Sequence, residues 1–145
     1  MKFFIDENLP HVLAQPLNAL FFSHQFRSCQ DEDLGGVKDI PLFHALHDRG
    51  FCAIITSDSN QVVRNDDERR VLHDNKIHWI GVKQPAAKGL HLLATWNANI
   101  TAAMPHILAE VACENVVPSY FATKGVAVEA NQRMRSGPLW LDKWS

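Results

Sequence analysis

Short apolar runs alternate with longer amphipathic segments along the first two thirds of this chain, and that alternation constrains the fold most. The clearest run, residues 51–56, is almost wholly apolar and lies between Gly50 and the polar stretch 57–60. Such a run is typical of a strand that is covered on both faces of a parallel sheet. Similar strands are predicted at residues 2–5, 25–29 and 77–82.

Segments with apolar residues at helical spacing separate these predicted strands. The first runs from about Asn8 to Leu20, and Pro16 is expected to kink or split it. The second opens at Asp39 and stops near Gly50, a typical C-terminal residue.

Two further helices are expected later in the chain. One runs from Asn65 to about Asn75, where Asn65 and Glu68 have capping-box spacing. The other is a long helix at 90–111, which Pro105 should divide or bend.

The order of these elements predicts an α/β fold, a three-layer domain with a mainly parallel central sheet flanked by helices. Residues 30–38 are polar and contain glycine, so we expect a loop there. Residues 119–123 and 126–129 flank Lys124-Gly125, which is a weak hairpin signal.

No linker is evident, so residues 1–145 are interpreted as a single domain. Its C-terminal extension, about 116–145, contains Trp140 and Trp144 and is expected to dock on this domain or on a partner.

Composition indicates the size of the domain and the cellular compartment that the protein suits. With 145 residues it is long enough for one domain with a real core. The three cysteines, Cys29, Cys52 and Cys113, are odd in number and widely spaced, which favours a reducing compartment over a disulfide framework. No apolar run approaches the roughly 20 residues that span a bilayer. We therefore expect a cytoplasmic protein without a membrane partner.

Acidic residues follow the predicted strands and helix starts. Asp6 follows residues 3–5, Asp58 follows the 51–56 strand, and Asp39 opens the second helix. In open α/β sheets, ligands bind outside the carboxyl ends of the strands. Carboxylates that converge there would hold a hard divalent cation, Mg²⁺ or Mn²⁺, because such ions prefer oxygen ligands. This arrangement suits phosphoryl or phosphodiester transfer.

The predicted ligands and catalytic residues are Asp6, Asp39 and Asp58, with Asn60 and Glu7 as second choices. The hydroxyl groups of Thr56 and Ser57 could orient these carboxylates without binding the metal themselves.

Each of these assignments has a simpler alternative. Asp39 could be only a helix N-cap, and Asp58 only a turn residue. Thr56 could be an ordinary strand residue. Asp6 is harder to explain without a site, because a carboxylate directly after a buried strand is costly to place without a partner.

Charge is distributed unevenly along the chain. Residues 1–75 contain 12 Asp and Glu against 7 Lys and Arg, whereas residues 76–145 contain 4 against 7. An acidic, metal-binding half beside a mildly basic half would suit a nuclease. The alternative is a chance imbalance of surface charge, which would give the same counts. Lys83 and Lys88 follow a predicted strand end and are candidates for contacting nucleic-acid phosphates.

Several motifs together resemble the PIN-like family related to the toxin nucleases of bacterial toxin–antitoxin pairs. The opening Phe4-Ile5-Asp6-Glu7-Asn8-Leu9-Pro10 is similar to the start of that family. Three later stretches agree in order and spacing: 24–28, Asp33 to Ile40 with its two glycines, and Ile54-Ile55-Thr56-Ser57-Asp58. The likeness covers about residues 2–80.

This resemblance implies a PIN-type fold, a Mg²⁺ or Mn²⁺ site and single-stranded RNA as the substrate. It implies metal-ligand roles for Asp6, Asp39 and Asp58, a protein antitoxin as partner, and a homodimer, for which Trp140 and Trp144 are candidate contacts. One departure concerns the second and third positions after the third acid, Asp58. Relatives often have an Asp followed by Phe there, whereas this chain has Asn60 and Gln61, which keep an oxygen ligand without its charge.

Two other functions remain open from the sequence. A phospho-acceptor receiver domain also has acids after its first strand, an Asp after its third and a lysine after its last. Asp6, Asp58 and Lys83 imitate that arrangement, but Asp39 and the loop before it have no role in it. The second alternative is a catalytically degenerate PIN-like module that only binds a partner.

Overall fold

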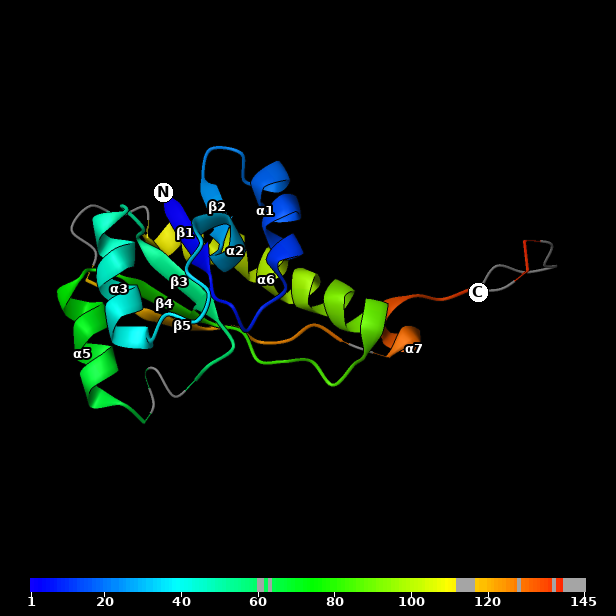
Figure 1. Cartoon of the computed structure of the whole chain (residues 1–145). Helices are drawn as coiled ribbons and strands as arrows, with labels where there is room; N and C mark the ends of the chain where they lie inside the picture. The colour runs from blue at the N-terminus through cyan, green and yellow to red at the C-terminus, as the bar shows by residue number, and fades with distance from the viewer. Residues whose placement is uncertain (60–61, 63, 112–116, 128, 137, 140–145) are drawn as a thin grey trace.

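The computed structural model describes residues 1–59, 62, 64–111, 117–127, 129–136 and 138–139 (Figure 1). Its centre is one sheet of five strands in the order β2-β1-β3-β4-β5, and every neighbouring pair is parallel. The strands are β1 (Lys2–Ile5), β2 (Gln25–Ser28), β3 (Ala53–Thr56), β4 (His78–Gly81) and β5 (Tyr120–Ala122).

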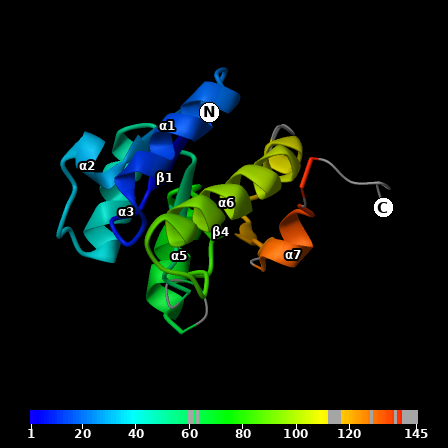
Figure 2. The same cartoon turned by 90° about the vertical axis from the view of Figure 1, so that its right-hand side faces the viewer.

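Helices cover both faces of this sheet, which confirms the predicted three-layer α/β fold. In Figures 1 and 2, α3 and α5 lie on one face, and α1 and α6 lie on the other. The helices that the structure describes are the short 3-10 helix η1 (His11–Leu13), α1 (Ala14–Leu20), α2 (Cys29–Glu32), α3 (Asp39–Asp48), α5 (Asp66–Asp74), α6 (Gly89–Val111) and α7 (Ala130–Arg133). None of them is both long and apolar enough to cross a membrane.

Two apolar cores separate the layers, and alternation along β1 shows how they arise. Phe3 and Ile5 point into the core shared with α1 and α6, whereas Phe4 points into the core shared with α3 and α5. All three side chains are fully buried. A strand that is buried on both faces has no room for a polar residue until it ends, and Asp6 stands at that point.

Two local predictions need correction in the first half of the chain. The first helical segment does split, but at the boundary between η1 and α1. Pro16 lies in the first turn of α1, where its missing N–H costs no hydrogen bond. The loop expected at 30–38 begins later, because α2 occupies Cys29–Glu32. Ser28 and Asp31 form a reciprocal capping box that starts this short helix.

Two predictions for the second half need correction. Pro105 lies inside α6 and does not divide it, while the bend expected there stays a prediction. Residues 119–129 do not form a hairpin, since β5 pairs in parallel with β4 and the described residues of 126–129 form no strand. Thr123 instead extends the pairing with β4, where its N–H donates to the carbonyl of Gly81 at 3.0 Å.

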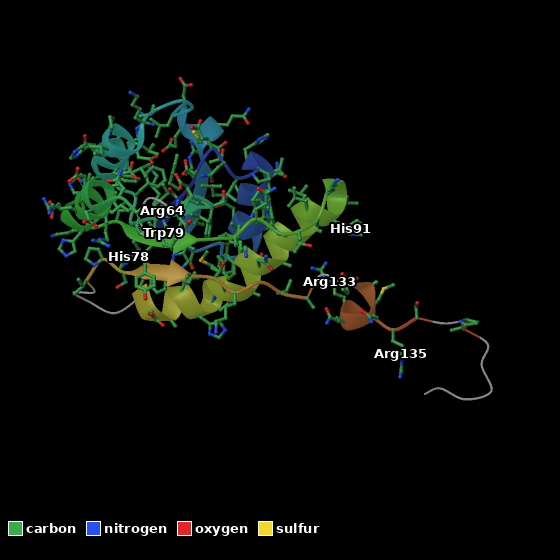
Figure 3. All side chains as sticks on the ribbon, turned by 90° about the horizontal axis from the view of Figure 1, so that it is seen from below. Arg64, His78, Trp79, His91, Arg133 and Arg135 are labelled. Atoms are coloured by element: carbon green, nitrogen blue, oxygen red, sulfur yellow. The ribbon has the colours of Figure 1, made fainter. Side chains whose placement is uncertain are left out.

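The stretch after β5 runs along the first half of α6. The N–H of Val126 donates to Oδ1 of the buried Asn99 at 2.8 Å, and Nη2 of Arg133 donates to Oγ1 of the buried Thr95 at 3.1 Å. In Figure 3, Arg133 lies near α7 and Arg135 lies further out on the stretch that follows. Trp140 and Trp144, the expected partner contacts, lie outside the described residues.

Candidate acidic site at the carboxyl edge of the sheet

Asp6 is the buried member of the predicted acidic set. Its residue is only 6% exposed, and its N–H continues the β1–β3 ladder by donating to the carbonyl of Ile55 at 2.9 Å. The side chain accepts hydrogen bonds from the N–H of Glu7 at 2.9 Å, from the hydroxyl of Thr56 at 2.8 Å and, more weakly, from Nδ2 of Asn8 at 3.4 Å. The position of this carboxylate is therefore fixed by its neighbours.

Thr56 connects the ends of β1 and β3 through one hydroxyl group. That hydroxyl donates to Oδ2 of Asp6 and accepts from the N–H of Asp58 at 3.0 Å and from Nδ2 of Asn8 at 3.1 Å. One donated and two accepted bonds are all that a hydroxyl can make. Thr56 is fully buried, and its bond to Asp6 is buried as well, whereas the other two bonds are partly buried. Its interpretation as an ordinary strand residue does not account for this contact set.

Asn8 makes a second connection between the same two strand ends. Besides donating to Thr56, its side chain accepts the N–H of Ser57 through Oδ1 at 3.1 Å. Asn8 was expected to help start the first helix, but the N-cap of η1 is Pro10. Asn8 instead holds the β3 turn against the β1 turn.

Glu7 reaches a third segment, the glycine-containing loop before α3. Its Oε2 accepts the N–H of Gly36 at 2.9 Å. Gly36 has a φ of 76°, a backbone conformation that favours glycine. Three consecutive side chains, Asp6, Glu7 and Asn8, thus fasten the end of β1 to both of the loops that carry the other acids.

Asp39 begins α3 and faces a fourth acid, Glu68 of α5. Glu68 lies close enough to Asp39 for the two carboxyl groups to interact. Burial raises the pKa of Glu68, and the nearby carboxylates of Asp39 and Asp58 raise it further. The interpretation of Asp39 as only an N-cap is wrong, because Lys38 occupies that position.

Asp58 follows β3 and completes the set. Its backbone is held by Thr56, and its charge acts on Glu68. The acids form a chain of neighbours: Thr56 links Asp6 to the backbone of Asp58, and Asp58 and Asp39 both lie close enough to Glu68 to raise its pKa. The structure thus brings segments that are far apart in sequence to one edge of the sheet.

The chemistry of this donor set fits a hard divalent cation, because the side chains are oxygen ligands and several are carboxylates. Burial raises the pKa of Glu68, the charges of Asp39 and Asp58 raise it further, and a cation would offset the like-charge part of this effect. As the side chains stand, the described residues include no group of three or more His, Cys, Asp or Glu that could hold a metal ion. Binding by three carboxylates would therefore require these groups to move closer together than they are here.

The other predicted site residues are placed as follows. Ser57 contributes its N–H to Asn8, and Asn60 lies outside the described residues. Lys83 follows β4 and Lys88 directly precedes α6, and both are exposed.

Sequence reasoning missed Glu68 because the motif around Asn65 already explained it. Asn65 does accept the N–H of Glu68 at 3.0 Å, as a capping residue should. The side chain of Glu68, however, lies near Asp39 and Asp58. The run Asp66-Asp67-Glu68 gave no separate signal, because acids in the first turn of a helix are favourable in any case.

Comparison with known proteins agrees with the resemblance found in the sequence. A family model described as a PIN like domain matches residues 1–84, which is more than half of the chain. No curated protein and no solved structure matched the chain. The fold and the site define an α/β protein with an acidic carboxyl edge, and the chain belongs to the PIN-like domain family.

Membership of this family indicates a nuclease-type function, and PIN nucleases typically use divalent metals. The matched region contains β1 to β4 and all four acids. It ends before Lys88 and α6. The family gives no support to the receiver-domain alternative.

Proposed function

We propose that this protein is a metal-dependent endoribonuclease that hydrolyses phosphodiester bonds in single-stranded RNA. The observation that carries the proposal is the buried carboxylate of Asp6, fixed by Thr56 at the carboxyl edge of a parallel sheet. Ligands of α/β proteins bind at this edge. The backbone of Asp58 is bonded to the same Thr56, and Asp58 and Asp39 both lie near a further acid, Glu68.

In this proposal Asp6, Asp39 and Asp58 hold one Mg²⁺ or Mn²⁺ ion, with Asn60 as a further oxygen ligand. Such an ion, when bound, supplies positive charge for the scissile phosphate and lowers the pKa of a coordinated water. Thr56 and Asn8 keep Asp6 and the Asp58 turn in a fixed relation, which reduces the reorganisation that binding requires.

The resemblance to toxin nucleases extends the proposal to a biological role. The protein would act in the cytoplasm as the toxin of a toxin–antitoxin pair. A protein antitoxin would cover the acidic edge and block access to RNA. A homodimer is part of the same proposal, since relatives of this kind often pair.

The test is cleavage of a labelled single-stranded RNA with Mg²⁺ or Mn²⁺. Wild-type protein should cut it, and chelation with EDTA should abolish cutting. Asp6→Asn keeps the shape of the side chain but removes its charge, so it should lose nearly all activity. Asp74→Asn is the matched control, because Asp74 is exposed at the far end of α5. Equal product patterns from wild type and Asp6→Asn would refute the proposal.

A degenerate binding module remains the second candidate, and one observation favours it. The described acids are not grouped as a ready-made metal site. In that case folded wild-type protein would show neither cleavage nor Mn²⁺ affinity, and Asp6→Asn would change nothing but stability.

A further inference from the structure

Two lysines occupy matching places at the carboxyl ends of β4 and β5. Gly81 of β4 pairs with Ala122 of β5, and Lys83 and Lys124 each follow their strand residue by two positions. The ladder continues past the strand ends, since the N–H of Thr123 donates to the carbonyl of Gly81 at 3.0 Å. Lys83 and Lys124 therefore occupy equivalent register positions just beyond the ends of two paired strands.

Asp58 likewise lies two positions beyond the end of the neighbouring strand, β3, whose last residue is Thr56. Thr56 of β3 pairs with Gly81, and the N–H of Val82 donates to the carbonyl of Thr56 at 2.8 Å. Adjacent strands lie about 4.8 Å apart. The carboxyl edge thus changes from acidic at β1 and β3 to basic at β4 and β5 within a few strand widths.

The turn that carries Lys124 is held on both sides. Before it, the hydroxyl of Thr123 also donates to the carbonyl of Gly81 at 3.0 Å. After it, the N–H of Val126 donates to Oδ1 of Asn99, which is only 5% exposed. The backbone at Lys124 is therefore fixed relative to β4 and α6.

The side chains of both lysines are available to a ligand. Lys83 and Lys124 are exposed, and neither forms a salt bridge with another residue in the part of the chain that the structure describes. The acids beside them repel phosphate. Positive charge within reach of the backbone is what a single-stranded nucleic acid needs for binding.

We infer that Lys124, together with Lys83, holds the phosphate backbone of single-stranded RNA beside the acidic site. The inference rests on the proposed function for its choice of ligand, and it adds a substrate-binding residue from outside the part of the chain that the family model matches. The strand would cross the edge from β5 toward β3, so that a phosphate next to the bound ones reaches Asp58 and Asp6.

The test measures binding separately from cleavage. Fluorescence anisotropy of a labelled single-stranded oligoribonucleotide is recorded in EDTA over a range of KCl concentrations. The proteins are wild type, Lys83→Gln, Lys124→Gln and the double variant. Lys76→Gln is the matched control, because Lys76 is exposed at the opposite end of β4. Thermal unfolding checks that every variant is folded.

Each of the two lysine substitutions should weaken binding several-fold at low salt. Each should also reduce the slope of log K against log salt by about 0.7, the value for one lost phosphate contact on a single strand. Lys76→Gln should match wild type. With Mn²⁺ present, Lys124→Gln should raise KM and leave kcat close to the wild-type value.

The outcomes separate this inference from the proposed function. If wild type does not bind the oligonucleotide, or if Lys124→Gln keeps the wild-type affinity and slope, the inference is overturned, whether or not RNA is cut. If binding depends on Lys83 and Lys124 but no metal supports cleavage, the inference stands and the endoribonuclease proposal fails.

Discussion

The hydroxyl of Thr56 donates a 2.8 Å hydrogen bond to Oδ2 of Asp6, a residue 50 positions earlier in the chain. The same oxygen accepts the N–H of Asp58 at 3.0 Å. One buried oxygen atom therefore sets where a carboxylate on β1 lies relative to the turn after β3. If these acids act together, Thr56 should matter for function as much as for stability.

Replacement of Thr56 by valine keeps the volume and removes the hydroxyl. Metal affinity and RNA cleavage should fall about tenfold to a hundredfold, the usual cost of losing a residue that orients metal ligands. The free energy of unfolding should fall by about 1–3 kcal/mol, because a buried acceptor on Asp6 loses its donor. Mn²⁺ titration calorimetry, cleavage rates and urea unfolding measure the three quantities.

Thr56→Ser is the matched control, since it keeps the hydroxyl and loses only a methyl group. Its metal affinity and cleavage rate should stay close to wild type. If the valine variant is less stable but cleaves at the wild-type rate, Thr56 contributes to stability and not to the function of the site.

Asn8→Ala should loosen the turn after β3. The side chain of Asn8 accepts the N–H of Ser57 and donates to Thr56, so its removal frees both groups. Hydrogen exchange at the Ser57 amide should accelerate. Asn8→Ala combined with Thr56→Val should cost less stability than the sum of the single changes, because the two side chains share a hydrogen bond. Strict additivity would show that they act independently.

Glu68→Gln should change how stability depends on pH in the absence of metal. Burial and the charges of Asp39 and Asp58 raise the pKa of Glu68. The folded protein then holds this proton more tightly than the unfolded chain does. The resulting stabilisation is complete below the ordinary glutamate pKa of about 4.3 and is lost as pH rises through the folded value. The glutamine variant cannot ionise, so this loss should be absent.

Urea unfolding at several pH values tests this directly. Glu110→Gln is the control, since Glu110 is an exposed glutamate on α6. Its pH dependence should follow wild type. If Glu68→Gln and wild type lose equal stability on going from acid to neutral pH, the proposed repulsion among the acids is absent.

His78 should make the docking of β5 sensitive to acid. Burial lowers its pKa, and its Nδ1 accepts the N–H of Ser119 at 3.1 Å, which requires an unprotonated nitrogen. A lowered folded pKa means that the stabilisation is present above about 6.5 and is lost as pH falls through the folded value. Exchange of the Ser119 amide should accelerate in that window. His78→Asn keeps an acceptor that does not titrate, so it should show a weaker pH effect.

The acids at the carboxyl edge were predictable because buried strands leave few choices. Phe3 to Ile5 and Ala53 to Ile55 are apolar and buried on both faces, so the first polar residues come where the strands end. Parallel strands then bring these ends together. That reasoning found Asp6 and Asp58 from local sequence alone, and the PIN-like resemblance that was drawn from the same residues is confirmed.

Contacts that depend on partners distant in sequence could not be predicted in the same way. Strand β5 has only three residues and no buried one, so nothing local distinguishes parallel pairing with β4 from the hairpin that Lys124-Gly125 suggested. Glu68 and Asn8 fit capping and turn roles equally well. Their actual partners, Asp39 and Thr56, lie on other elements.

The most direct test of the account is an anomalous difference map from crystals soaked in Mn²⁺. We expect one strong peak at the carboxyl edge, within coordination distance of oxygen atoms from Asp6, Asp39 and Asp58. A map without a peak there at saturating Mn²⁺, with the three carboxylates too far apart to share an ion, would contradict it.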